Sequence, residues 1–467
     1  MISVDTLPDD VILAIFHQYV NDDDHIEKER ERAWQSLVHV SRRWRSITFE
    51  SPHHLKLLLV YTERTPARDT LDVWPALPLV ILCNGIEHVD DIIAVLERSD
   101  RVCRIHLADL QRLDLEIILA TMQQQFPELT DLSLEFGSEA VRFVPDSFLG
   151  GSAPCLQTLT LVDIPFPELP KLLQSATHLV TLHLYDIPHS GYFSPEALVT
   201  ALSTLISFEE LTLVFQSPRS FPDQASRCPP PSARSVLSVL TRLTFQGVSE
   251  YLEDLVNRID APRLNLLRII FFNDIVFDTP RFMQFITRTP TSRALGNAHI
   301  TLWDDSSTNV RFSPRTSGDL EINVGVLCRG LEWQLSSLEQ VCTSCLPLPP
   351  LSMLEDLYIY DYPRLQQDWK DDIENGLWLE PLRPFTAVKN LYLSKHIARR
   401  IGPALQELAE GRTMEVLPDL QNIFFEGLES SGPVQEGIAK FVAARQVACC
   451  PIAVSSWANS DRDKVYR

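Results

Sequence analysis

The segment LQTLTL, Leu156–Leu161, decides the fold, because the same pattern of six residues returns along most of the chain. Its second half alternates leucine with threonine, as expected for a short strand that buries one face and exposes the other. Further copies of this L-x-x-L-x-L pattern, some with another apolar residue at a leucine position, begin at Val102, Leu129, Leu179, Phe208, Leu240, Leu264, Leu295, Leu354, Val388 and Leu420.

The copies recur at intervals that define a repeat. Successive copies begin 23 to 34 residues apart, except for 59 residues between Leu295 and Leu354, which leaves room for one more copy near Asp319. Amphipathic segments between copies, such as 113–126, 194–206 and 248–259, predict helices. A strand and a helix at this interval are typical of leucine-rich repeats, whose period is about 20–29 residues.

The sequence therefore predicts an α/β repeat fold. Residues 56–446 are expected to form a leucine-rich-repeat-like solenoid with a curved parallel sheet, followed by a C-terminal tail over 447–467. Two polar segments interrupt the rhythm and are predicted to be exposed loops: Gln216–Ser235, rich in Pro and Ser, and the stretch WDDSSTNVRFSPRTSGD that begins at Trp303.

The charge of the chain limits its partners. Its 467 residues include 62 acidic and 41 basic side chains, for a net charge of -21. This balance repels phosphate backbones, so nucleic acid is not an expected ligand. The apolar runs are far shorter than the roughly 20 residues of a membrane span. The first residues carry Asp5, Asp9 and Asp10 instead of a basic secretory signal, so we expect a cytoplasmic or nuclear protein.

The first 55 residues differ from the repeat. Leu7 and Pro8 precede a predicted helix whose apolar residues Val11, Ile12, Ile15, Phe16 and Tyr19 are expected on a single face. After a charged run over 21–32, interpreted as a solvated linker, Trp34, Leu37, Val40, Trp44 and Ile47 form a second helical series. So little apolar surface rarely makes an independent domain. The helices could pack on the rest of the chain or dock on a partner.

Two parts of this segment carry a resemblance to a known family. LPDDVILAIF, followed by SLVHVSRRWRSIT, resembles the F-box motif, with extra charged residues between its halves. The resemblance implies an N-terminal helical F-box over 1–55 that binds a Skp-type adaptor and, through it, a cullin ubiquitin ligase. The residues that it places against the adaptor are Leu7, Pro8, Ile12, Ile15, Phe16, Leu37, Val40 and Trp44. For Val40 and Trp44, packing within the motif itself is equally possible.

A second resemblance lies near the C-terminus. Residues 378–446 are similar to the shared C-terminal region of a large group of fungal F-box proteins that carry a divergent leucine-rich array. Together the two resemblances imply a substrate-recognition subunit of an SCF-type ligase, whose repeats hold a protein target. An interaction scaffold without a role in ubiquitination is the alternative, and an enzyme on a solenoid-like body is a third reading.

The chain offers no motif that nominates a catalyst. Cys342 and Cys345 form CTSC, which could supply half of a zinc site, but no second pair of ligands lies nearby in the sequence. Motifs of serine hydrolases, zinc peptidases and phosphate-binding loops are absent. We therefore predict no catalytic, cofactor-binding or metal-binding residue and a non-catalytic subunit that takes no cofactor.

Overall fold

The computed structural model shows a mixed α/β protein whose strands are mostly parallel. The structure describes residues 7–20, 33–52, 55, 57–62, 65–85, 89–136, 144–218, 233–272, 279–289, 295–303, 307–314, 320–328, 330–345, 354–361, 374–409, 412–427 and 433–457. The chain divides into two compact units, Met1–Phe208 and Glu209–Arg467, which are described in turn.

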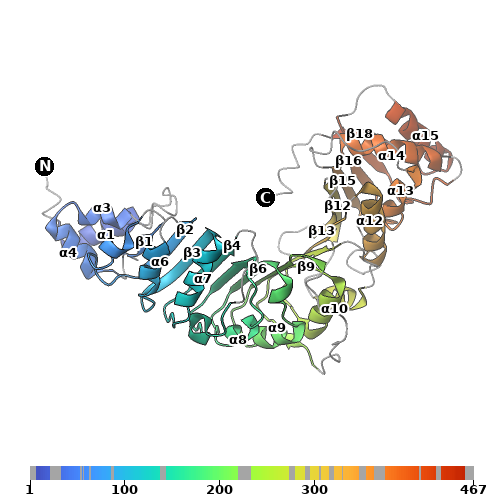
Figure 1. Ribbon diagram of the computed structural model, residues 1–467. Helices are drawn as coiled ribbons and strands as arrows, with labels where there is room; N and C mark the ends of the chain where they lie inside the picture. The colour runs from blue at the N-terminus through green and yellow to red at the C-terminus, as the bar shows by residue number, and fades with distance from the viewer. Residues whose placement is uncertain are drawn as a thin grey trace. The chain divides into compact units, whose positions relative to one another are not determined.

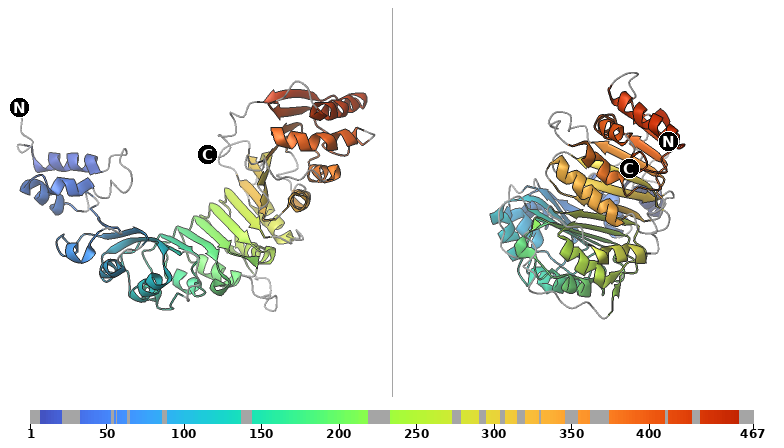
Figure 2. Two further views of the ribbon diagram at one scale, coloured as in Figure 1. Left: turned by 45° about the horizontal axis from the view of Figure 1, so that its top comes forward. Right: turned by 90° about the vertical axis from the view of Figure 1, so that its right-hand side faces the viewer.

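The first unit holds a parallel sheet whose strand order follows the chain. Its strands are β1 (Leu59–Tyr61), β2 (Leu79–Asn84), β3 (Val102–Leu110), β4 (Asp131–Phe136), β5 (Thr158–Val162) and β6 (Thr181–Ile187). The connecting helices are α5 (Ala67–Thr70), α6 (Val89–Leu96), α7 (Arg112–Thr121), α8 (Leu169–Leu173) and α9 (Pro195–Leu202), with short 3-10 turns at Phe148–Gly151 and His189–Gly191. Helices α6 to α9 lie along one face of this sheet (Figures 1 and 2).

Register explains why the repeated leucines build the core of this unit. Ile105, Leu132, Leu159 and Leu182 are paired across β3 to β6, and all four are buried beneath the helices. The alternate positions carry Arg104, Asp131, Thr158 and Thr181, which are half-buried. Each strand therefore has an apolar helix-covered face and a polar open face, as the alternation predicts.

The N-terminal helices α1 (Asp9–Val20), α3 (Ala33–Val38) and α4 (Arg42–Glu50) also belong to the first unit. We call residues 7–20 and 33–50 the helical segment.

The second unit contains a longer, mixed sheet. Its strands, in spatial order, are β7 (Glu210–Phe215), β9 (Arg242–Gly247), β11 (Leu266–Phe271), β14 (Glu321–Val326), β13 (Ser307–Pro314), β12 (Leu295–Trp303), β15 (Asp356–Asp361), β16 (Asn390–Leu393), β17 (Asn422–Glu426) and β18 (Ala453–Trp457). Neighbours are parallel except β13, which is antiparallel to both β12 and β14. Strands β8 (Ser235–Val236) and β10 (Ile259–Asp260) form a separate short parallel pair.

The helices of this unit cover one face of its sheet (Figure 1). They are α10 (Ser249–Arg258), α11 (Pro280–Arg288), α12 (Leu331–Cys345), α13 (Asn375–Leu379), α14 (Lys395–Leu408) and α15 (Pro433–Val447), with a 3-10 turn at Glu380–Leu382.

The structure confirms the predicted strands and corrects one predicted loop. Each of the eleven segments that carry the L-x-x-L-x-L pattern contains a strand. The stretch that begins at Trp303 was wrongly predicted as a loop, because Ser307–Pro314 form β13 in the middle of the sheet. Thr308, Val310 and Phe312 are buried in alternation with half-buried Asn309 and Arg311. Since β13 is antiparallel, the expectation of a wholly parallel sheet is also wrong.

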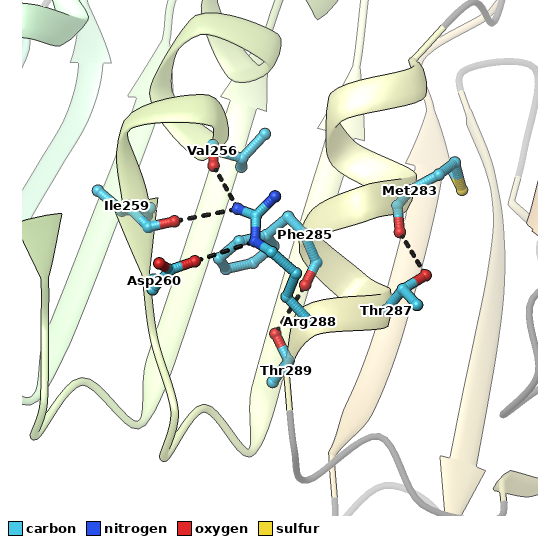
Figure 3. A network of polar contacts seen from close by, with 8 residues as sticks. All are labelled: Val256, Ile259, Asp260, Met283, Phe285, Thr287, Arg288 and Thr289. Atoms are coloured by element: carbon cyan, nitrogen blue, oxygen red, sulfur yellow. Dashed lines mark hydrogen bonds and ion pairs between the residues drawn. The ribbon is translucent and has the colours of Figure 1, made fainter. Parts of the chain in front are cut away.

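Side chains near the ends of three helices bind backbone carbonyls of the preceding strand–helix segment. Figure 3 shows Arg288 of α11, which donates hydrogen bonds to the carbonyls of Val256 (3.1 Å) and Ile259 (3.2 Å) and pairs with Asp260 (2.9 Å). Arg101 similarly donates to the carbonyl of Leu77, and Gln124 to that of Leu96. These bonds span 24 to 32 residues, close to the interval between successive copies of the sequence pattern.

The remaining sequence predictions concern the linker, the Pro/Ser loop, the C-terminal tail and membrane spans. The linker over 21–32, and residues 219–232 of the predicted Pro/Ser loop, lie outside the described residues. Within the region predicted as a tail, β18 pairs in parallel with β17. Among the described residues, no helix combines the length and apolar character needed to cross a bilayer.

Candidate functional site

Helix α1 buries one row of apolar side chains within the helical segment. Ile12, Phe16 and Val20 recur at intervals of four residues, which places them on one helical face, and all three are buried. Buried side chains from α3 and α4 complete this small core: Trp34, Leu37, Val38 and Ile47. The helical segment therefore has a packed interior of its own.

A second apolar row on α1 stays exposed. Pro8 lies just ahead of the helix and is exposed, and Val11, Ile15 and Tyr19 follow at steps of three and four residues with 40%, 49% and 40% of their surface exposed. We call these four residues the outer stripe. Val40, between α3 and α4, is 60% exposed. The five residues predicted to share one face of α1 therefore include two that are buried, Ile12 and Phe16, and three that are exposed.

Arg43 fixes the start of α1 to α4. Its Nη2 donates to the carbonyl of Leu7 (2.6 Å) and to Oδ1 of Asp9 (2.5 Å), and its Nε donates to the same carboxylate oxygen (3.1 Å). These contacts set the direction in which the chain enters the helix, so Pro8 is held at the start of the outer stripe and Leu7 beside it.

Local signals in the sequence also position α4. Ser41 is its N-cap and accepts a hydrogen bond from the backbone N–H of Trp44, as expected for serine at this position. Arg45 donates to the carbonyl of Val38 at 3.0 Å, which ties α4 to the end of α3. The Trp44 ring, half-buried, lies 4.7 Å from the ring of Phe16.

An aromatic cluster attaches the helical segment to the rest of the first unit. The indole N–H of Trp34 donates to the carbonyl of Leu58, just before β1, at 2.8 Å. The Trp34 and Phe49 rings meet Trp74 edge-on, with centroids 5.4 and 6.4 Å apart. Edge-to-face pairs of this kind contribute about 0.5–1.5 kcal/mol each beyond burial. The side of the helical segment near Trp34 is thus covered by this chain.

The eight residues implied by the F-box resemblance divide into three groups. Ile12, Phe16 and Leu37 are buried within the helical segment. Leu7 and Trp44 are half-buried, whereas Pro8, Ile15 and Val40 are exposed. Val11 and Tyr19 extend the exposed group, and the spacing from Pro8 through Val11 and Ile15 to Tyr19 is the sequence signal that identifies them.

The two thiols of the CTSC motif lie in the protein interior. Cys342 and Cys345 are buried in α12. Burial raises the pKa of Cys345 to about 12 and raises that of Cys342 well above its ordinary value, so both thiols stay protonated at neutral pH. The part of the chain that the structure describes contains no group of three or more potential metal ligands.

Comparison with known proteins adds no identification. The chain matches no protein-family model and no curated protein.

Proposed function

We propose that this protein is the substrate-recognition subunit of an SCF-type ubiquitin ligase, in which the helical segment binds a Skp-type adaptor and the repeat units bind a protein target. The outer stripe of α1 is the observation that carries the proposal. It consists of apolar side chains that remain exposed beside a row of buried ones, Ile12, Phe16 and Val20, on the same helix.

The placement of the outer stripe supports docking on another protein. Contiguous exposed apolar side chains are typical of interaction sites, whereas single ones are common on any surface. The stripe continues to the half-buried Leu7, whose carbonyl is fixed by Arg43. These features are consistent with the F-box resemblance, which places Leu7, Pro8, Ile15 and Val40 against the adaptor. Ile12, Phe16 and Leu37 would then act indirectly, by shaping the surface that the adaptor contacts.

The mostly parallel sheets of the two units are consistent with the second half of the proposal. A leucine-rich-repeat-like solenoid offers an extended surface on the open face of its strands, where side chains can vary without disturbing the leucine core. The mechanism would be proximity, since a bound target would be held near a conjugating enzyme that other subunits supply. In this role the chain itself makes and breaks no covalent bonds.

A pull-down with the Skp-type adaptor tests the docking surface. We expect Ile15→Asp to abolish adaptor binding, because it places a charge in the middle of the outer stripe. We expect the same of the double variant Leu7→Ala with Pro8→Ala, because it removes apolar side chains at the start of the stripe. Ile206→Asp is the matched control, because Ile206 is 75% exposed in the same unit but lies beyond α9. Wild-type binding by the Ile15→Asp and double variants, with unchanged circular dichroism, would rule out this docking site.

A second measurement distinguishes a substrate-recognition subunit from the alternative, an interaction scaffold. A recognition subunit should co-purify with adaptor and cullin, and ubiquitinated clients should accumulate on it when the proteasome is blocked. Adaptor and cullin binding without any such client would favour the scaffold.

A further inference from the structure

A row of stacked aromatic rings crosses the open face of the second unit. His299, Tyr358, Tyr392 and Phe424 lie in register on β12, β15, β16 and β17. Successive ring centroids are 4.5, 4.2 and 4.5 Å apart, and neighbouring planes differ by only 8 to 11°. We call these four residues the aromatic row. Because each inner ring is covered on both faces by its neighbours, only a terminal ring can offer a face to a ligand.

The two ends of the aromatic row differ. His299 is buried, with 6% of its surface exposed, whereas Phe424 is half-buried. On the side away from Tyr392, the residue in register with Phe424 is Ser455 of β18, which is small and exposed. Among the described strands, β18 is the last of this sheet. The Phe424 end therefore presents a ring face above a small side chain.

Trp457 borders this end of the row. It is paired in register with Glu426, and its indole N–H donates to the carbonyl of Leu393 on β16 at 3.4 Å. The Trp457 ring also meets the Tyr392 ring edge-on at 5.9 Å. The indole thus reaches across the end of β17, beside the position of Glu426.

A parallel row of amides lies two residues earlier on the same strands. Asn422 donates to the side-chain oxygen of Asn390 at 2.8 Å, and Asn390 donates to the carboxylate of Asp356 at 2.7 Å. Amide donors satisfy the hydrogen-bonding capacity of Asp356 without neutralising its charge. The negative charge of Asp356 therefore remains on this face.

On the strands that carry the aromatic row and on β18 the charged open-face residues are acidic, whereas Arg311 of β13 lies in register with His299, beyond the other end of the row. On the described residues of β12, β15, β16, β17 and β18, the open-face positions include Asp356 and Glu426 but no Lys or Arg. Glu426 lies two residues beyond Phe424 on the same side of β17, and no described Lys or Arg pairs with it. Burial lowers the pKa of His299 to about 4, so the row itself is uncharged at neutral pH.

We propose that the Phe424 end of the aromatic row binds an arginine side chain from a basic segment of a protein partner. The guanidinium would stack on Phe424 above Ser455 and pair with Glu426. A planar cation suits this position because it can lie flat on a ring while donating hydrogen bonds to a carboxylate in its plane. The identification of that partner as a ubiquitination target rests on the proposed function, whereas the binding surface does not.

The same features disfavour other ligands of aromatic surfaces. A single-stranded nucleic acid stacked on Phe424 would bring phosphates toward Asp356 and Glu426, and the described open-face positions of β15 to β18 carry no Lys or Arg to neutralise them. An oligosaccharide would use several ring faces, but three of the four rings are covered by stacking or burial.

Fluorescence anisotropy with the full-length chain tests the proposal. The probe is a fluorescein-labelled Gly-Arg-Gly-Arg-Gly peptide, compared with Gly-Lys-Gly-Lys-Gly and Gly-Gln-Gly-Gln-Gly at the same salt concentration. We expect the arginine peptide to bind best, and Phe424→Leu and Glu426→Gln each to raise its Kd about three- to tenfold. Glu436→Gln is the matched control, because it removes one exposed carboxylate from α15.

The possible outcomes are distinct. Equal loss in Glu436→Gln and Glu426→Gln, or no loss in Phe424→Leu, would show unspecific attraction to an acidic chain and overturn the proposal. Tighter binding of labelled oligo-uridine or cellohexaose than of the arginine peptide would overturn it as well. The double variant Leu7→Ala with Pro8→Ala should bind the peptide normally, so failure of adaptor docking and failure of the peptide site can be told apart.

Discussion

The guanidinium of Arg43 and the carboxylate of Asp9 form an ion pair of 2.5 Å, although 34 positions separate them in the sequence. The same guanidinium binds the carbonyl of Leu7. One side chain thus determines how the chain enters α1 and where the outer stripe begins. The two arginines beside it in the sequence, Arg42 and Arg45, are more exposed than Arg43.

Loss of Arg43 should loosen the start of α1. We expect Arg43→Ala to increase the hydrogen exchange of backbone amides in the first turns of α1 about fivefold, since an exposed ion pair and one further hydrogen bond together contribute about 1 kcal/mol. Exchange measured by mass spectrometry checks this. Arg42→Ala, on the same helix, should leave the exchange unchanged, and equal effects of both variants would contradict the assigned role.

Phe16 and Ile15 are neighbours in sequence with opposite surroundings. Phe16→Ala should cost about 3–5 kcal/mol, because it removes a buried ring that also contacts Trp44. Ile15→Ala should change stability by less than about 0.5 kcal/mol. Protease cleavage rates within residues 9–50 measure the difference, and similar rates for the two variants would contradict the assignment of Phe16 to the core and of Ile15 to the exposed row.

Gly437 allows α15 to approach α14 closely. A Cβ atom at this position would lie 2.8 Å from the carbonyl oxygen of Gly402. Gly437→Ala should therefore destabilise the contact by about 1–3 kcal/mol, since two backbones must move apart. Gly376→Ala in α13 is the control, because nothing lies within 4 Å of its Cβ position and alanine favours a helix. Thermal unfolding followed by circular dichroism should show a lower midpoint only for Gly437→Ala.

Arg288 should resist replacement by lysine. Arg288→Lys keeps the charge but removes the guanidinium group, whose N–H groups bind Asp260 and two carbonyls. We therefore expect the free energy of unfolding to fall by about 1–3 kcal/mol. Urea unfolding checks this. Arg281→Lys, at an exposed position of the same helix, should have no effect. If Arg288→Lys left the free energy of unfolding unchanged, water would have to replace these hydrogen bonds without loss of stability.

His299 makes stability depend on pH. Its pKa is lowered to about 4 in the folded protein, against about 6.5 in an unfolded chain, first by burial and then by Arg311. The unfolded state therefore binds more protons between pH 6.5 and 4, and stability falls as the pH decreases through this window. The loss from this group should reach about 2 kcal/mol at pH 5. His299→Phe, which can still stack on Tyr358, should remove this part of the dependence when urea midpoints are compared at pH 7.5 and 5.

The sequence was sufficient to locate most strands. Leu132, Leu159 and Leu182 are buried in register because each occupies the same position of a repeated pattern, and alternation alone assigns the buried face. Helices between the copies followed from their amphipathic periodicity. These features are local, so they can be predicted without knowing which segments meet.

The remaining features depend on long-range contacts. Val310 and Phe312 alternate with polar residues as a strand requires, but the surrounding Ser, Thr, Asn and Pro concealed the pattern. Ile12 and Ile15 have the same side chain, and only the position of α3 and α4 decides which one is covered. The role of Arg43 depends on a contact across 34 positions, which local pattern does not specify.

The antiparallel strand β13 has a consequence for the kinetics of folding. Asn297 of β12 pairs with Asp356 of β15, 59 positions later, whereas β12, β13 and β14 pair with their immediate neighbours in sequence. Closing short loops costs less entropy, so this three-stranded meander can form early and offer an edge on each side, to β11 and to β15. We therefore expect pulse-labelled amides of β12 to β14 to gain protection before those of β16 and β17. The second unit would then assemble outward from its interior in both directions.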